Sequence, residues 1–176
     1  MTQRSDTLRQ SVSSVEEEFH CSVCLSLSLR KSFKTMSGRS SARRHVLQML
    51  FLVDQNKEAD PRRIQRYLED ELKNVDLVEF AWALFRGVRE NQAELDELIR
   101  KTASNWRLER MAVTDRNVIR LGAYEMRHYG TAPAIVLNEA IEIAREFGTE
   151  NSASFVNGVL DKLVPDAARS DAKTAQ

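Results

Sequence analysis

Apolar residues recur along most of the chain at the spacing of an α-helix. In "NSASFVNGVLDKL", Val156, Val159, Leu160 and Leu163 follow one another at intervals of three and four residues, which places them on one helix face. Further segments upstream show the same periodicity, and none alternates convincingly as a half-buried strand would. The sequence therefore predicts an all-α fold with seven helices, which begin near residues 40, 61, 76, 91, 114, 133 and 151.

Polar residues and a glycine mark several ends of these helices. Asp60-Pro61 places a good N-cap residue before a proline at the first helical position. Thr114 is the expected N-cap of the fifth helix. Gly148 follows the sixth helix, and we expect it at the C′ position in the left-handed conformation that ends many helices.

The Asn157-Gly158 step carries two conflicting signals. Asn-Gly is the strongest short-range signal for a β-hairpin turn, yet the apolar residues on both sides have helical spacing. Glycine inside a helix costs about 1 kcal/mol relative to alanine. We therefore expect Gly158 to lie within the last helix and to permit close approach of a neighbouring helix, while Asn157 supplies a hydrogen bond.

The two ends of the chain differ from its centre. Residues 1–36 are rich in serine and show no sustained periodicity, which predicts a disordered extension. Residues 37–165 form the predicted helical domain, and residues 166–176 a flexible tail. The only cysteines, Cys21 and Cys24, are interpreted as reduced thiols, because with His20 they offer only three of the roughly four ligands of a structural zinc site. We expect no metal and no cofactor.

Composition and motifs narrow the function further. Lysine plus arginine (26) equals aspartate plus glutamate (26), so any surface for nucleic acid must be a local patch. No stretch is long enough to cross a membrane. The apolar run "CSVCLSLSL" follows Glu16, Glu17 and Glu18, where a signal peptide would carry positive charge, so we expect a cytoplasmic protein. A glycine-rich phosphate loop, a metalloprotease motif and a nucleophile elbow are all missing, so we expect no enzymatic activity.

The start of the first helix carries a basic patch. No acidic residue occurs between Met36 and Val53, and helical spacing places Arg44, Gln48 and Phe51 on one stripe. Cations for phosphates, an amide for a base edge and an aromatic ring for stacking suit single-stranded RNA. The alternative is that Phe51 belongs to the core and the arginines form a solvated helix start. The candidate RNA-binding residues of this helix are Arg39, Arg43, Arg44, Gln48 and Phe51.

Several motifs together resemble the NusB family of bacterial transcription antitermination factors. They are "SARRHVLQMLF", "LFRGVRENQAELDELI", "RNVIRLGAYEM" and "TAPAIVLNEAIEIAREFGTENSASFVNGVLDKLVP", and the resemblance covers about residues 37–165. It implies a fold of two small helical subdomains. It also implies binding to the boxA element of nascent ribosomal RNA transcripts together with NusE, a small-subunit ribosomal protein. The complex then helps RNA polymerase read through terminators, without catalysis.

The resemblance also implies roles for individual positions. Phe51 stands where the family commonly has a tyrosine implicated in RNA contact. Asp115, at the start of the fifth helix, is implied to contact RNA or the partner, with complementation of the helix dipole as the alternative. Asn151 is an N-cap candidate as well as an RNA-binding one. The last-helix positions at which the family contacts RNA are Asn151, Ser152, Ser154 and Phe155.

Two other interpretations stay open at this stage. A NusB-like domain also occurs in a ribosomal RNA methyltransferase, so the chain could be an RNA-binding module of such a system. The third interpretation is a structural helical dimer, because some members of the family dimerise and so cover their RNA surface.

Overall fold

The computed structural model describes residues 38–56, 58–103 and 107–165, all of which lie in the second of two units that divide between Thr35 and Met36. The predicted extension and tail, with Cys21 and Cys24, lie outside the described residues. The α-helices are α2 (Gly38–Gln55), α3 (Pro61–Leu72), α4 (Val75–Glu90), α5 (Gln92–Thr102), α6 (Val113–Tyr124), α7 (Pro133–Phe147) and α8 (Ser152–Leu163). These seven helices, with no strand in the described ranges, confirm the predicted fold class.

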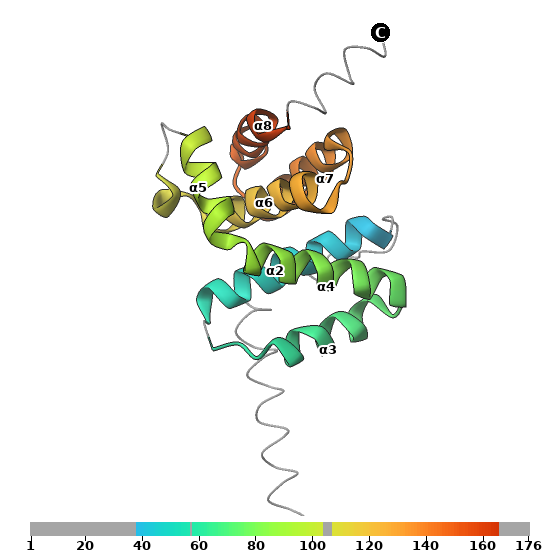
Figure 1. Ribbon diagram of the computed structural model, residues 1–176. Helices are drawn as coiled ribbons and strands as arrows, with labels where there is room; N and C mark the ends of the chain where they lie inside the picture. Colours follow the sequence, from blue (N-terminus) through green and yellow to red (C-terminus); the bar gives the residue numbers. More distant parts are fainter. Residues whose placement is uncertain (1–37, 57, 104–106, 166–176) are drawn as a thin grey trace, which may run out of the picture. The chain divides into compact units, whose positions relative to one another are not determined.

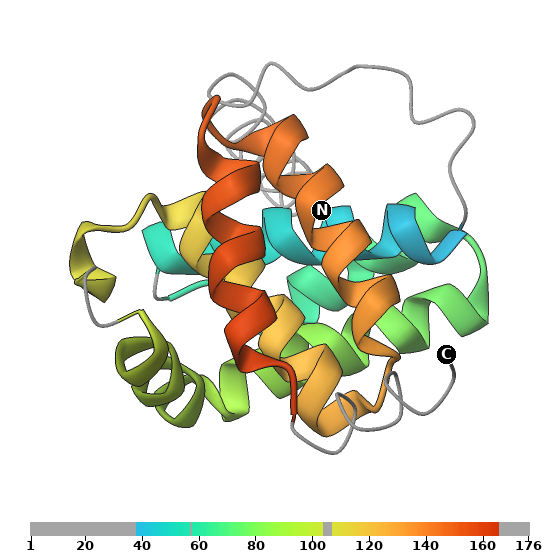
Figure 2. The same cartoon turned by 90° about the horizontal axis from the view of Figure 1, so that it is seen from above.

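The helices form two groups that share a boundary (Figure 1). In the first group, α2 and α3 both pack against α4. In the second, α6, α7 and α8 pack against one another, and α5 packs against α6 and α8. Figure 2 looks down on α7 and α8, which lie side by side. Contacts of α6 with α2 and α4 join the groups, which correspond to the two helical subdomains expected from the family resemblance.

Close helix packing occurs at two glycines that the sequence does not single out. A Cβ atom on Gly87 of α4 would overlap the ring of Tyr124 of α6, and one on Gly122 would lie 2.9 Å from Leu160 of α8. Gly158 is exposed, and a Cβ there would meet nothing within 4 Å. The prediction that Gly158 permits a close helix approach is therefore wrong.

Asn157, the neighbour of Gly158, also differs from expectation. It lies within α8 and is exposed to solvent. Its side chain forms no hydrogen bond with another residue in the described part of the chain. The hydrogen bond predicted for Asn157 is therefore not found in the described ranges.

The helix ends agree with their local signals only in part. The Asp60 side chain accepts a hydrogen bond from the Arg62 N–H at 2.9 Å, which confirms this N-cap. Thr114 is not a cap, because α6 already begins at Val113. Gly148 ends α7 with extended φ and ψ of −99° and −161°, so the left-handed conformation predicted for it is wrong.

A different constraint explains the glycine at position 148. A Cβ atom there would lie 2.6 Å from the Ala144 carbonyl oxygen and would also overlap the Ser152 side chain. The glycine therefore lets the chain fold tightly from α7 into α8.

The fifth predicted helix continues past α6 as a short π-helix, η2 (Glu125–Tyr129). It ends at Gly130, whose φ of 78° is left-handed and therefore favours glycine. Glu125, at the junction of α6 and η2, is only 1 % exposed. This buried carboxylate must have a partner, since an isolated buried charge is strongly unfavourable.

Candidate nucleic-acid interface

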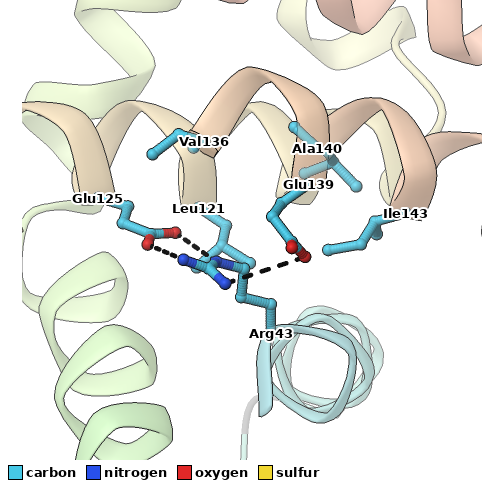
Figure 3. A pocket seen from close by; sticks show the side chains of 9 residues that line it. Arg43, Leu121, Glu125, Val136, Glu139, Ala140 and Ile143 are labelled. Carbon is cyan, nitrogen blue, oxygen red and sulfur yellow. Dashed lines mark hydrogen bonds and ion pairs between the residues drawn. The ribbon is translucent and has the colours of Figure 1, made fainter. Parts of the chain in front are cut away.

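Arg43 is the partner of Glu125. Its Nε donates to Glu125 Oε2 at 2.9 Å and its Nη2 to the other carboxylate oxygen, while its Nη1 lies 3.9 Å from Glu139 of α7 (Figure 3). The Arg43 side chain is 5 % exposed. This guanidinium therefore joins α2 to η2 and α7 inside the protein.

Arg44 is also buried and paired. Its Nε donates to Glu146 Oε2 at 2.6 Å, and its Nη1 donates to the Ser40 carbonyl oxygen at 3.0 Å. The residue as a whole is 2 % exposed. The view of Arg43 and Arg44 as a solvated helix start is therefore wrong, and their contact with RNA stays a prediction.

Arg39 differs from these two arginines because it is exposed. Its Cζ lies 5.1 Å from the centroid of the Phe80 ring, within reach of a cation–π interaction. Tyr129 packs edge-on against the same ring. Arg39 is thus a solvent-exposed cation whose side chain packs against Phe80 of α4.

Gln48 and Phe51 lie at the surface of α2, each half-buried. The Tyr67 hydroxyl of α3 donates to Gln48 Oε1 at 3.1 Å. Its oxygen lies 3.1 Å from Nδ1 of His45, and burial lowers the pKa of this histidine. These bonds fix the orientation of the Gln48 amide, with its carbonyl oxygen toward α3. Phe51 is not part of the fully buried core.

The α8 candidates have different environments. Asn151 and Ser154 are exposed, and Phe155 is half-buried. Ser152 is 1 % exposed, and its Oγ accepts from the Thr149 N–H at 2.8 Å. Asn151 precedes the first turn of α8, but its side chain makes no capping hydrogen bond. Ser152 therefore shapes the turn before α8, while Asn151, Ser154 and Phe155 offer surface to a ligand.

Asp115 lies inside the protein beside Ser152. It is 7 % exposed and belongs to the first turn of α6. Burial raises the pKa of the Asp115 carboxyl, and a hydrogen bond from the Ser152 side chain offsets part of that rise. Oδ1 of Asp115 has no hydrogen-bond partner among the described residues. The carboxylate thus links α6 to the start of α8.

The first turns of α6 also hold the end of α2. Asn117 donates to Asp54 Oδ2 at 3.1 Å, and Arg116 and Arg120 each lie 3.3 Å from the same oxygen. Arg120 also binds the carboxylate of Asp96 on α5 through two hydrogen bonds, of 2.7 and 2.9 Å. The start of α6 therefore contacts both candidate segments. It binds Asp54 at the end of α2, the helix that carries Gln48 and Phe51, and through Asp115 it contacts Ser152 at the start of α8.

Other kinds of site find little support in the described ranges. No group of three or more histidine, cysteine, aspartate or glutamate side chains in these ranges could hold a metal ion. No described helix has the length and apolar character needed to cross a membrane. A small cavity lies beside Arg43, but it is bordered by the paired carboxylates of Glu125 and Glu139.

The sequence and the fold both match known proteins. Residues 40–165 match the model of the NusB family. The chain belongs to the NusB family. A NusB transcription antitermination protein from Sorangium cellulosum is 42 % identical over 137 residues, which are 77 % of this chain and 98 % of the relative. The corresponding protein from Elusimicrobium minutum is 43 % identical, over 73 % of this chain and 94 % of its own length.

Two solved NusB structures share the fold. NusB from T. maritima has a TM-score of 0.67 and 34 % identity, covering 77 % of this chain and 99 % of that one. A crystal structure of NusB and NusE in complex with double-stranded RNA has a TM-score of 0.65 and 27 % identity, covering 73 % and 97 %. The matched protein of that complex is therefore similar to this chain in both sequence and fold.

Sequence reasoning missed several residues that organise this NusB-type surface. Tyr67 and Glu146 hold Gln48 and Arg44, and Asp54 gathers three donors from α6. Tyr67 gives no signal in the sequence, because a half-buried tyrosine is common on amphipathic helices. Only the packing of α3 and α7 against α2 identifies these partners.

Proposed function

We propose that this protein is a transcription antitermination factor that binds boxA RNA of nascent ribosomal RNA transcripts together with NusE. In this role it helps RNA polymerase read through terminators. The observation that carries the proposal is its similarity to NusB antitermination proteins over 94–98 % of their own lengths. The solved complex of NusB, NusE and RNA gives this role a structural precedent.

The exposed candidates suggest how RNA would be held. Phe51 and Phe155 each offer a half-buried ring on which a base can stack, the form of contact that single strands accept without strict sequence demands. Nε2 of Gln48, for which the described ranges show no acceptor, can donate to a base edge, because Tyr67 already occupies the carbonyl oxygen. Asn151 and Ser154 supply further polar contacts. Arg43 and Arg44 hold the helices that carry these groups.

This role requires no catalysis and places the protein in the cytoplasm, where nascent RNA is made. The alternative of a module in a ribosomal RNA methyltransferase system has no specific observation in its favour. Dimerisation remains compatible with RNA binding if the RNA competes with the second protomer. Light scattering with and without boxA RNA measures that competition, and a dimer that persists with bound RNA would refute it.

A titration with NusE tests the proposed function. Labelled boxA RNA is titrated with this protein alone, with the NusE of the same organism alone, and with an equimolar mixture. We expect the mixture to bind more tightly than either component, and RNA to strengthen the protein pair by the same factor, because coupling is reciprocal. A scrambled RNA is the control. Equal affinities with and without NusE would refute cooperative loading.

A further inference from the structure

Binding of an RNA backbone requires cations that phosphates can reach. Each phosphate that a cation neutralises releases condensed counterions, and this electrostatic effect supplies much of the affinity of RNA-binding proteins. Two of the three arginines at the start of α2 are buried against carboxylates. Arg39, the third, is exposed, but it lies about two and a half helical turns before Gln48 and thus on the opposite side of α2. Cations for the α2 stripe of Gln48 and Phe51 therefore have to come from a neighbouring helix.

Helix α3 has such cations on its first two turns. Arg62, Arg63 and Arg66 are exposed, while Ile64 and Leu68 on the opposite side are buried in the core. Within the described ranges, Arg62 and Arg66 form no ion pair with a carboxylate. We call Arg62, Arg63 and Arg66 the α3 arginines.

The charges of α3 oppose its own dipole at both ends. The amino end of a helix carries partial positive charge and favours carboxylates, and the carboxyl end favours cations. Here the first turn has no acidic residue and the last turn has no basic one. Glu69, Asp70 and Glu71 instead follow the arginines. Asp60 at the N-cap and Lys73 at the C-cap compensate the dipole only in part, and an anionic ligand at the arginine end would add to this compensation.

Tyr67 places the α3 arginines beside the α2 stripe. Its hydroxyl is 3.1 Å from both Gln48 Oε1 and His45 Nδ1, so this side of α3 faces α2. Arg63 lies one helical turn before Tyr67 and thus on the same side of α3. Arg66 directly precedes Tyr67, and Arg62 lies one turn before Arg66. The arginines therefore extend from the edge of the stripe onto the outer face of α3.

We propose that the α3 arginines bind the phosphodiester backbone of the single-stranded RNA whose bases contact Gln48 and Phe51. This inference rests on the proposed function and extends its site from α2 to α3. The RNA would cross from the α2 stripe over Tyr67, with its phosphates on the arginines of α3. Arginine suits this task because its planar guanidinium can bind two phosphate oxygens at once.

A triple variant, Arg62→Gln, Arg63→Gln and Arg66→Gln, tests the proposal. Removing the cation from one phosphate of a single strand lowers the slope of log affinity against log salt by about 0.7, so the full set lowers it by about 2. At 0.1 M salt, boxA RNA should bind about a hundredfold more weakly. Scrambled RNA should weaken to a similar degree. The melting temperature should not fall, because the substitutions remove cations from a helix amino end.

The matched control removes three other exposed arginines, through Arg86→Gln, Arg89→Gln and Arg100→Gln on α4 and α5. It changes the net charge equally and should leave the salt slope near that of the parent protein. If the α3 variant keeps the parent slope, or if both variants lose equally, the proposal is overturned while the proposed function stands. If the parent protein binds boxA RNA no better than scrambled RNA, even with NusE, the proposed function fails and this inference with it.

Discussion

The Phe51 side chain has two roles: it packs partly against the protein, and it is proposed to contact RNA. Its ring is half-buried on α2, beside Leu50 and Leu52, which belong to the core. A half-buried ring can leave one face for a base. Its substitution therefore tests binding with a smaller effect on folding than a core residue would have.

We expect Phe51→Ala to weaken boxA binding by about 1–3 kcal/mol at every salt concentration, with little change in salt slope. The free energy of unfolding should fall by less than the roughly 3–5 kcal/mol typical of a core phenylalanine. Fluorescence titration and urea unfolding measure the two effects. Phe51→Tyr is the control, since it retains the ring. A variant that melts far below the parent but binds normally once folded would assign Phe51 to the core alone.

Asp115 makes stability depend on pH. Its folded-state pKa is raised above the ordinary value of 3.8, so the folded protein holds this proton more tightly than the unfolded chain does. The resulting stabilisation is present below about pH 4 and is lost as pH rises through the raised pKa. Asp115→Asn should therefore raise the melting temperature at pH 7 more than at pH 4. Equal shifts at the two pH values would contradict this linkage.

At the scale of helices, the periodicity of apolar residues predicts the helices more reliably than single capping residues predict their ends. The seven helices follow from apolar spacing, because each one buries a continuous face. The predictions from Thr114 and Gly148 are wrong. Threonine also occurs inside the first turn of a helix, and glycine also occurs where a Cβ atom would overlap a neighbouring atom. Which glycine lies at a helix crossing depends on residues far away in sequence, as with Gly87 and Tyr124.

The glycines of α4 and α8 give opposite predictions. Gly158→Ala should raise the free energy of unfolding by about 0.5–1 kcal/mol, because the site is open and alanine favours the helix. Gly87→Ala should lower it by about 1–3 kcal/mol, because the new methyl group overlaps the Tyr124 ring. Urea unfolding of the two variants compares them directly. A stabilised Gly87→Ala protein would show that the ring moves aside freely.

At the scale of the whole described unit, ion pairs of two buried arginines join the two groups of helices. Arg43 and Glu125 are 82 residues apart, and Arg44 and Glu146 are 102 apart. A basic cluster in a sequence looks the same whether it faces solvent or a carboxylate on a distant helix. The arginine-rich start of α2 could therefore be located from sequence, but its pairing could not.

Arg43→Ala should lower the free energy of unfolding by about 3–5 kcal/mol, because it leaves the Glu125 carboxylate buried without its partner. The double substitution Arg43→Met and Glu125→Leu should recover much of this loss, since it removes both charges. Thermal and urea unfolding measure both. If the single variant unfolds like the parent while its RNA salt slope flattens, Arg43 serves phosphate rather than the fold.

Helix α6 contacts α2 and α4 on one side and α5, α7 and α8 on the other. Its backbone amides can exchange with solvent only when both groups of helices separate from it. We therefore expect the α6 amides to exchange with deuterium most slowly, at the rate of global unfolding. Helix α3 packs mainly against α4 and α2 and should exchange sooner. Helix α3, whose arginines are proposed to bind the RNA backbone, is thus expected to unfold locally while the rest of the described unit stays folded.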